Sequence, residues 1–379
     1  MSALSVSEAF SDLADPRMER TRLHSLHDIL VIALCAVLCG AEGWDDFVEF
    51  AHAKHEWLSA RLTLSNGIPC ADTFRRVFAR LDPEAFTAGF LRWTQAVAED
   101  SQAAGLRVVA VDGKTLRHSF DTASEQKAVH IVSAWASESR LVLAQTKVED
   151  KSNEITAVPV LLGMLDIAGC IVTADAMSCQ KTIVTQIREQ KGEYVLALKG
   201  NHEHLAEDVA LLFAHAEAKR WEERPHSVHT ALEAEHGRLE TRTCRVIALS
   251  DLAGTWDDIA AEWTGLAALV EIHSKRQVGE KTSEERRYYL SSLPKSAKVH
   301  LKIIRKHWEI ENSVHWVLDV VMNEDACRIR KDNAPQNMAT LRHLVLNLVR
   351  QETTHKRGVK AKIKRAGWDN DYLARLISI

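Results

Sequence analysis

The sequence lacks the cysteine patterns of secreted and zinc-binding proteins. Seven cysteines occur in 379 residues, an odd number at irregular spacing, and there are no paired CxxC motifs. This spacing gives no disulfide framework and no zinc site built from cysteine pairs. Cys35 and Cys39 lie in an apolar run, where small buried side chains are expected. We therefore expect a reducing compartment.

Long hydrophobic runs and a secretory signal are missing as well. The apolar run from Ile29 to Cys39 covers about half of the roughly 20 residues that span a membrane, so it predicts a core helix. The start MSALSVSEAF does not have the charged-then-apolar order of a signal peptide. We expect a cytoplasmic protein that has no membrane partner.

An excess of positive charge is also absent, because the net charge is −4. Bulk electrostatics therefore gives no argument for a nucleic-acid partner. The segment 341–379 is different: its Lys and Arg residues outnumber its acidic residues by nine to three. This basic C-terminal tail is either simply solvated or in contact with phosphate groups.

Hydrophobic periodicity divides the chain into four parts. Residues 1–100 are expected to be helical, for DNA binding or dimerisation, and 101–217 to form the first part of an α/β core. Residues 218–298 predict a mostly β insertion, and 299–379 complete the core with a helix that carries Glu311. The order β-β-β-α-β-α-β-α in the core predicts a mixed sheet with helices on its faces.

One helical segment of the N-terminal part carries several arginines. The stretch DTFRRVFARL follows a turn at Asn66-Gly67, and we expect Asp72 to cap it. Arg75, Arg76 and Arg80 fall on its polar side. A turn followed by such a helix is compatible with DNA recognition, and equally with a packing or dimerisation module.

Two aspartates occur where predicted strands end. Asp112 ends the strand LRVVAVDG, and Asp175 ends the strand CIVTADA. In a sheet with this strand order the first and fourth strands are neighbours, so the two carboxylates can meet at one sheet edge. A single aspartate after a strand is more commonly a turn former or a helix cap.

A third acid lies in the helical stretch 302–325. Ile304, Trp308, Leu318 and Met322 are expected on one apolar face, and Glu311 falls on that face too. A carboxylate in an apolar stripe needs a cation or a donor. Three carboxylates with open coordination positions suit Mg²⁺ better than zinc. Two ions about 3.5–4 Å apart would suit phosphoryl transfer.

Several blocks carry a resemblance to a known family. AVDGKTLRHS, VTADAMSCQKTI, YVLALKGNH and RKHWEIENSVHWVLDVVMNEDACRIR resemble the signature blocks of H-repeat-associated transposases, which are DDE enzymes of bacterial insertion sequences with an RNase H-like core. The N-terminal DPR and LHDIL…ALCAVLCGAEGWDDFVEFA blocks resemble the helical domain of that family. The resemblance covers nearly the whole chain and implies Asp112, Asp175 and Glu311 as the catalytic, metal-binding acids.

The resemblance also implies a reaction and its partners. The reaction would be Mg²⁺-dependent cleavage at the ends of an insertion sequence, with Mn²⁺ as a substitute ion. The freed 3′-hydroxyl would then be joined to target DNA. The partners would be the terminal inverted repeats and target DNA, bound by a homodimer in the bacterial cytoplasm at the nucleoid. The alternatives are an inactive or domesticated DNA-binding derivative, and an RNase H-like nuclease without strand transfer.

The chain departs from the wider superfamily around Glu311. Many relatives have Tyr, Arg and Lys at positions −7, −4 and +7, where this chain has Ile304, His307 and Leu318. Phosphate contacts must then come from other residues. The candidates for DNA binding are Lys114, Lys199, Arg305, His307 and His315. The two histidines could instead bind metal or pair with Glu311 along the helix. Glu324 and Asp325 are alternatives to Glu311 as the third catalytic acid, or they have a structural role.

Overall fold

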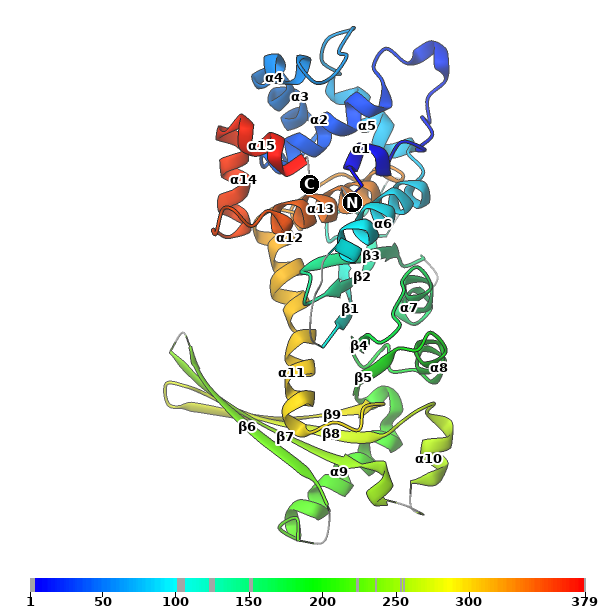
Figure 1. Ribbon diagram of the computed structural model, residues 1–379, viewed down its shortest axis with the longest axis vertical. Helices are drawn as coiled ribbons and strands as arrows, with labels where there is room; N and C mark the ends of the chain where they lie inside the picture. The colour runs from blue at the N-terminus through cyan, green and yellow to red at the C-terminus, as the bar shows by residue number, and fades with distance from the viewer. Residues whose placement is uncertain are drawn as a thin grey trace. The chain divides into compact units, whose positions relative to one another are not determined.

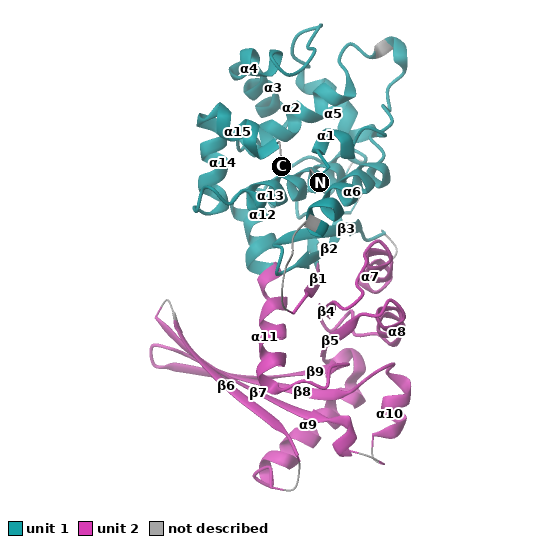
Figure 2. Cartoon of the chain, viewed as in Figure 1, with its two compact units in different colours: residues 1–103, 113–151, 311–379 teal, residues 104–112, 152–310 magenta. Residues whose placement is uncertain are grey.

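The computed structural model describes residues 4–100, 106–122, 127–149, 153–222, 225–235, 237–252, 254 and 256–377 (Figure 1). The chain forms two compact units (Figure 2). Unit 1 contains residues 1–103, 113–151 and 311–379, and unit 2 contains residues 104–112 and 152–310. The polypeptide therefore passes between the units four times, and neither unit is one continuous segment.

Unit 2 is built on a mixed sheet whose strand order is β1-β4-β5-β9-β8-β7-β6. Strands β1, β4 and β5 run parallel, and each later pair is antiparallel. The strands are β1 (Val108–Thr115, of which 108–112 lie in unit 2), β4 (Ile171–Ala174), β5 (Glu193–Leu198), β6 (Ser227–Glu235), β7 (Arg238–Ala248), β8 (Ala268–Val278) and β9 (Lys281–Ser291). The mixed α/β fold predicted from the sequence is confirmed.

Crossover helices precede β4 and β5, because parallel strands need such a connection, and further helices precede β6 and β8 or follow β9. They are α7 (Glu154–Gly163), α8 (Lys181–Glu189), α9 (Glu203–Ala218), α10 (Asp257–Glu262) and α11 (Ala297–His307), with 3-10 turns η2 (Gly200–His202) and η3 (Leu249–Leu252). Leu301 and Ile304 of α11 belong to one buried cluster with Cys244, Ile272 and Tyr289 of the sheet. Apolar burial thus fixes α11 on one sheet face.

The insertion is mostly β, as predicted, but it holds two elements that the sequence reading missed. β6, with the sequence SVHTALEAE, has no apolar face pointing inward, so its alternation did not predict a strand. α10 is a short helix of six residues without buried members. Both are formed by tertiary context more than by local pattern.

Unit 1 is mainly helical. It contains α1 (Val6–Ala9), α2 (Leu26–Leu38), α3 (Trp44–Ala53), α4 (His55–Ser59), α5 (Ala71–Arg80), α6 (Pro83–Asp100), α12 (Trp316–Val320), α13 (Ala334–Gln351), α14 (Val359–Trp368) and α15 (Asn370–Ile377), the 3-10 turn η1 (Glu19–Thr21), the π-helical turn η4 (Glu311–His315) and the hairpin β2 (His130–Ala136) and β3 (Leu141–Lys147). Across the described residues, no helix has the length and apolar character needed to cross a membrane.

Helix α13 is the centre of unit 1. It packs against α2, α5 and α6 and against β3, and fifteen of its eighteen residues are buried. Asn347 of α13 donates to the carbonyl oxygen of Val142 (2.8 Å) and accepts from its backbone N–H (2.9 Å). Gln145 donates to Thr340 (2.6 Å). These buried amides satisfy one edge of β3, which fixes the helix against the strand.

Helix α5 has the predicted inward face, with Phe74, Val77 and Phe78 buried. The expected cap is wrong: Cys70 is the N-cap residue, and Asp72 lies in the first turn, 2.6 Å from the guanidinium of Arg76. Asp72 also pairs with Arg75. The arginines on this helix are therefore partly neutralised by their own helix.

The basic C-terminal segment is not a solvated tail. It folds into α14 and α15, and Ile363, Tyr372 and Leu373 are buried. Glu352, just after α13, accepts a hydrogen bond from the hydroxyl of Tyr372 (2.8 Å). The charge pattern alone concealed this packing, because the apolar residues are interspersed among the lysines.

Candidate active site

The two strand-end aspartates lie on neighbouring parallel strands. The register of β1 and β4 pairs Val111 with Ala174, so Asp112 and Asp175 each follow the last paired residue of their strand. Adjacent strands are about 4.8 Å apart. The preceding residues are buried, whereas both aspartates are partly exposed. The sheet therefore presents two carboxylates side by side at the carboxyl ends of its parallel strands, where α/β proteins bind ligands.

Two hydrogen bonds from Ser178 hold the carboxylate of Asp175. The backbone N–H and the hydroxyl of Ser178 both donate to its Oδ1, each over 3.2 Å. Hydrogen bonds from two donors orient the carboxylate before any ligand arrives.

The loop after Asp175 is fastened by residues that the sequence reading did not single out. The side-chain amide of Asn201 donates to the carbonyl oxygen of Ala176. His202 Nε2 lies 2.7 Å from the carbonyl oxygen of Cys179 and donates to it, and its ring packs edge-on against Trp263. Both residues belong to the block YVLALKGNH. The signal was an Asn-His pair directly after a buried strand.

Glu311 begins the π-helical turn η4 instead of continuing a regular helix. His315 Nδ1 lies 3.1 Å from Glu311 Oε2, and the side chain of Glu311 is 60% exposed. The prediction that Glu311 lies on one apolar face with Ile304, Trp308, Leu318 and Met322 is wrong, because Glu311 and Trp308 are exposed whereas the other three are buried. A π turn holds more residues than an α turn, so it shifts the helical phase on which that prediction depended.

Helix α13 supports this turn from within unit 1. The guanidinium of Arg350 donates to the carbonyl oxygen of Ser313 and lies over the ring of Trp135 at 4.5 Å. Burial lowers the pKa of Arg350 to about 9. A π turn leaves backbone groups in need of partners, and Arg350 supplies one. Glu311 belongs to unit 1 and the two aspartates to unit 2, so the convergence of all three acids remains a prediction.

Lys114 is enclosed by carboxylates of unit 1. Its ammonium lies 2.6 Å from Asp319, 3.0 Å from Glu324 and 3.4 Å from Asp325. Burial lowers the pKa of Lys114, but Glu324 and Asp319 outweigh burial and raise that pKa. The buried Glu324 also faces Arg342 at 3.6 Å. This geometry favours a structural role for Lys114 and for the rival acids Glu324 and Asp325.

The other candidates for DNA contact are placed differently. Lys199 is exposed after β5. Arg305 forms an ion pair with Glu233 of β6. His307 Nδ1 lies 3.1 Å from the hydroxyl of Thr173, two residues before Asp175. His315 is buried against Glu311. Their contacts with DNA remain predictions.

The two family positions at −7 and +7 from Glu311 cannot contact phosphate here. Ile304 and Leu318 are 5% and 1% exposed, and both side chains are apolar. Phosphate contacts must therefore come from other residues, as the sequence indicated.

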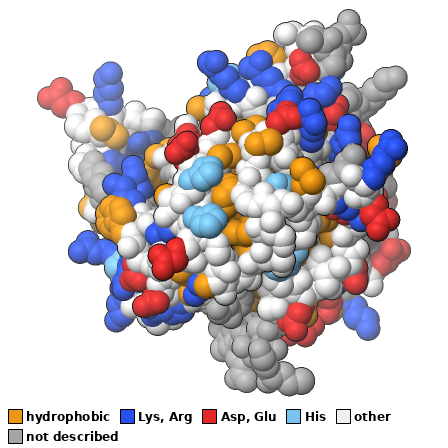
Figure 3. All heavy atoms as spheres, turned by 90° about the horizontal axis from the view of Figure 1, so that it is seen from above, with side chains coloured by type: hydrophobic (Ala, Val, Ile, Leu, Met, Phe, Trp, Pro, Cys, Tyr) orange, Lys and Arg blue, Asp and Glu red, His pale blue; other side chains and the backbone are white. Residues whose placement is uncertain are grey.

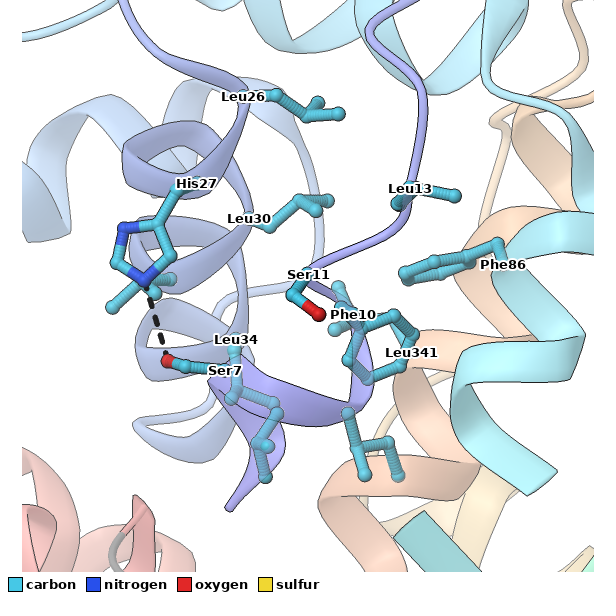
Figure 4. A pocket seen from close by; sticks show the side chains of 13 residues that line it. Ser7, Phe10, Ser11, Leu13, Leu26, His27, Leu30, Leu34, Phe86 and Leu341 are labelled. Atoms are coloured by element: carbon cyan, nitrogen blue, oxygen red, sulfur yellow. Dashed lines mark hydrogen bonds between the residues drawn. The ribbon is translucent and has the colours of Figure 1, made fainter. Parts of the chain in front are cut away.

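A cavity of about 350 Å³ in unit 1 lies among α1, α2, α6 and α13. Leu30, Leu34 and Phe86 line it, and its polar edge includes a Ser7–His27 hydrogen bond of 3.3 Å (Figure 4). Among the described residues, no carboxylate lines this pocket, so its chemistry does not suit a metal.

On the face shown in Figure 3, Lys and Arg side chains are mixed with Asp and Glu.

Comparison with known proteins gives matches along nearly the whole chain. The profile of the family described as "Transposase DDE domain" matches residues 103–348, and that described as "DDE_Tnp_1-associated" matches residues 7–94. "H repeat-associated putative transposase YhhI" of Escherichia coli (strain K12) is 38% identical over 377 residues, which cover 98% of this chain and 97% of the relative.

Two further relatives extend the comparison. "Putative transposase YncI" of Escherichia coli O157:H7 is 39% identical over 381 residues, covering 100% of this chain and 95% of the relative. "Uncharacterized protein in dhlA 3'region" of Xanthobacter autotrophicus is 44% identical over 286 residues, covering 75% and 92%.

Proposed function

Because this chain belongs to the family of transposases with a DDE domain, we propose that it cuts DNA at the ends of an insertion sequence and joins the freed 3′-hydroxyl to target DNA. The observation that carries the proposal is the position of Asp112 and Asp175, each directly after the last paired residue of two adjacent parallel strands. Two carboxylates in that position fit metal-assisted phosphoryl transfer better than a structural role.

The proposed metal ligands are Asp112, Asp175 and Glu311. Their donor atoms are carboxylate oxygens, which suit Mg²⁺ or Mn²⁺. A pair of such ions, when bound, neutralises charge on the phosphate and activates the attacking oxygen. The fit is supported by the partial exposure of both aspartates and by the exposed carboxylate of Glu311.

The residues around the acids have separate proposed roles. Ser178 fixes one oxygen of Asp175, and His315 holds one oxygen of Glu311. Lys199, Arg305 and His307 are the proposed phosphate contacts on unit 2. Arg305 would have to exchange its ion pair with Glu233 for a phosphate, which keeps its charge balanced.

The proposed partners follow from the reaction. The substrates are the terminal inverted repeats of the element and a target duplex. Two element ends must be held together for joining, so a homodimer on DNA is proposed. A protein that acts on chromosomal DNA would work in the bacterial cytoplasm, at the nucleoid.

The proposal is tested by incubating the purified protein with Mg²⁺ and the DNA that flanks its own gene. End-specific nicks with joined products support a transposase. Specific binding without nicks would indicate an inactive DNA-binding derivative, and cuts without joining would indicate a nuclease. Either of these two results would overturn the proposal.

Asp112→Asn and Glu311→Gln should each lower the nicking rate by about a thousandfold, because several kcal/mol of charge stabilisation would be lost. DNA binding, measured by gel shift, should be retained. Glu309→Gln is the matched control, since Glu309 is an exposed acid two residues before Glu311. Nicking at the parent rate in either test variant would show that the triad is wrong.

A further inference from the structure

Strand β6 is the last strand in the order of the sheet of unit 2. It pairs with β7 over nine residues without a register shift, and no other described strand pairs with it. In Figure 1 the hairpins β6–β7 and β8–β9 extend beyond α9 and α11. Proteins usually protect such an edge with lysine, proline or a bulge. The sequence SVHTALEAE contains neither lysine nor proline, and the register shows no bulge.

In β6 the larger apolar side chains point to solvent and most of the polar side chains point to the sheet face that α11 covers, which is the reverse of an ordinary half-buried strand. Val228 and Leu232 are 55% and 66% exposed, and Thr230 and Ala234 on the same face are exposed too. His229 and Glu233 point to the other face, where Glu233 pairs with Arg305 of α11 and with Arg242 of β7, the latter over 2.6 Å. Leu239 of β7, opposite Ala234, is 40% exposed and continues the apolar row. Exposed apolar rows of this kind mark interaction sites.

We propose that β6 pairs with β6 of a second copy of this chain, antiparallel and centred on Ala231. Residues opposite each other in an antiparallel pair share a face. This register places Val228 opposite Ala234 and Thr230 opposite Leu232, so the two exposed rows join into one.

A cross-strand pair between the imidazole of His229 and the carboxylate of Glu233, which Arg242 and Arg305 already hold in place, selects this register and this occupant. With Ala231 on the two-fold axis, His229 of each copy lies opposite Glu233 of the other. Shifting the axis to Thr230 places Glu233 opposite Ser227, and shifting it to Leu232 places Glu233 opposite Ala231. Only the Ala231 register pairs the histidine with the acid, and it does so twice.

The two-fold symmetry closes the assembly. Each copy uses the same strand, so pairing consumes both open edges and gives a dimer, not a filament. The contact lies within unit 2 and uses none of the proposed metal ligands. It does not depend on the proposed cutting activity, so it is measured without DNA, and a failure of either proposal leaves the other intact.

The first test compares Leu232→Lys with Leu211→Lys. Leu211 of α9 is 67% exposed, which matches Leu232 at 66%, so the two substitutions differ in place and not in exposure. In sedimentation equilibrium over a micromolar concentration series, the parent should dimerise and Leu232→Lys should weaken dimerisation by about tenfold or more. Leu211→Lys should behave as the parent. A monomeric parent, or equal loss in both variants, would overturn the proposal.

A second test uses the sign of a charge. His229→Asp faces Glu233 with a like charge and should weaken the dimer, whereas His229→Arg should strengthen it. Both variants keep the apolar row. A change in the same direction for both would contradict the register.

The third test reads the register directly. Ala231→Cys places two thiols opposite each other across the axis, within the Cα separation that a disulfide accepts. In His229→Cys, the two thiols lie several residues apart along the strands, because residue 229 of each copy is opposite residue 233 of the other. Both are made in a Cys70→Ser background, because Cys70 is exposed. Oxidation should cross-link Ala231→Cys and not His229→Cys. Cross-linking of both, or of neither, would refute the pairing.

Discussion

Single residues near the candidate site divide into those that hold the fold and those that hold the acids. Lys114 follows Asp112 by two residues, yet three carboxylates of unit 1 surround its ammonium. Removing one partner of a buried ion cluster leaves the others without compensation, which costs about 3–5 kcal/mol. Lys114, although it lies close to a proposed metal ligand in the sequence, therefore belongs to the residues that hold the fold.

Asn201 belongs to the second group, because it fastens the loop that follows Asp175. Asn201→Ala should weaken the apparent affinity for Mg²⁺, so that the concentration needed for half-maximal nicking rises by about 10–100-fold, as for other residues that support metal ligands. Gln186→Ala is the control, since Gln186 donates to the carbonyl of Pro159 in the same unit. The two variants should melt at similar temperatures. An Mg²⁺ titration that is unchanged in Asn201→Ala would remove the positioning role.

At the scale of elements, the strands were predictable and the irregular turns were not. β1, β4 and β5 are continuous apolar runs that end in polar residues, so their existence followed from the sequence, as did the adjacency of β1 and β4. β6 was missed because its apolar residues point to solvent. The face of Glu311 was assigned wrongly because periodicity assumes a regular helix, whereas backbone packing around Arg350 permits a π turn.

The link between α13 and α14 is held by Glu352. Burial raises the pKa of Glu352, but hydrogen bonds from Thr354 and Tyr372 outweigh it and lower the pKa to about 2 from 4.5. A depressed pKa stabilises the fold above about pH 4.5, and this contribution is lost as the pH falls towards 2.

Glu352→Gln should therefore destabilise the protein by about 2 kcal/mol at neutral pH, in line with a charged hydrogen bond. The difference from the parent should shrink at about pH 3.5. Urea unfolding at both pH values measures it. Glu49→Gln, an exposed acid on α3, should show neither effect. A difference that is constant with pH would mean that the carboxylate charge is not involved.

At the scale of the whole molecule, the chain order does not match the packing. The sequence predicts boundaries between functional parts of the chain at residues 100, 217 and 298, and these boundaries remain predictions. The two compact units are divided differently, because each combines segments that are far apart in the sequence. In unit 1, α13 lies more than two hundred residues beyond α2, α5 and α6 and packs against all three. Local periodicity cannot reveal a contact at such a separation, because it describes only which face of each helix is apolar.

A fragment of residues 1–103 should therefore fail to fold cooperatively, because it would expose the apolar surfaces that α13 covers. Its thermal transition, followed by circular dichroism, should be broad or absent. Joining residues 331–352 to the fragment through a flexible linker should restore a sharper transition. A sharp transition in the fragment alone would show that the N-terminal helices are self-sufficient.

The position of α13 also constrains how a gene of this kind can decay. A stop codon before residue 334 removes the helix against which the N-terminal helices pack, so the shortened product should fail to fold. A lineage that keeps the protein while losing the chemistry must then retain the full reading frame. Such a lineage should differ from its active relatives by substitutions at the proposed metal ligands and not by deletions.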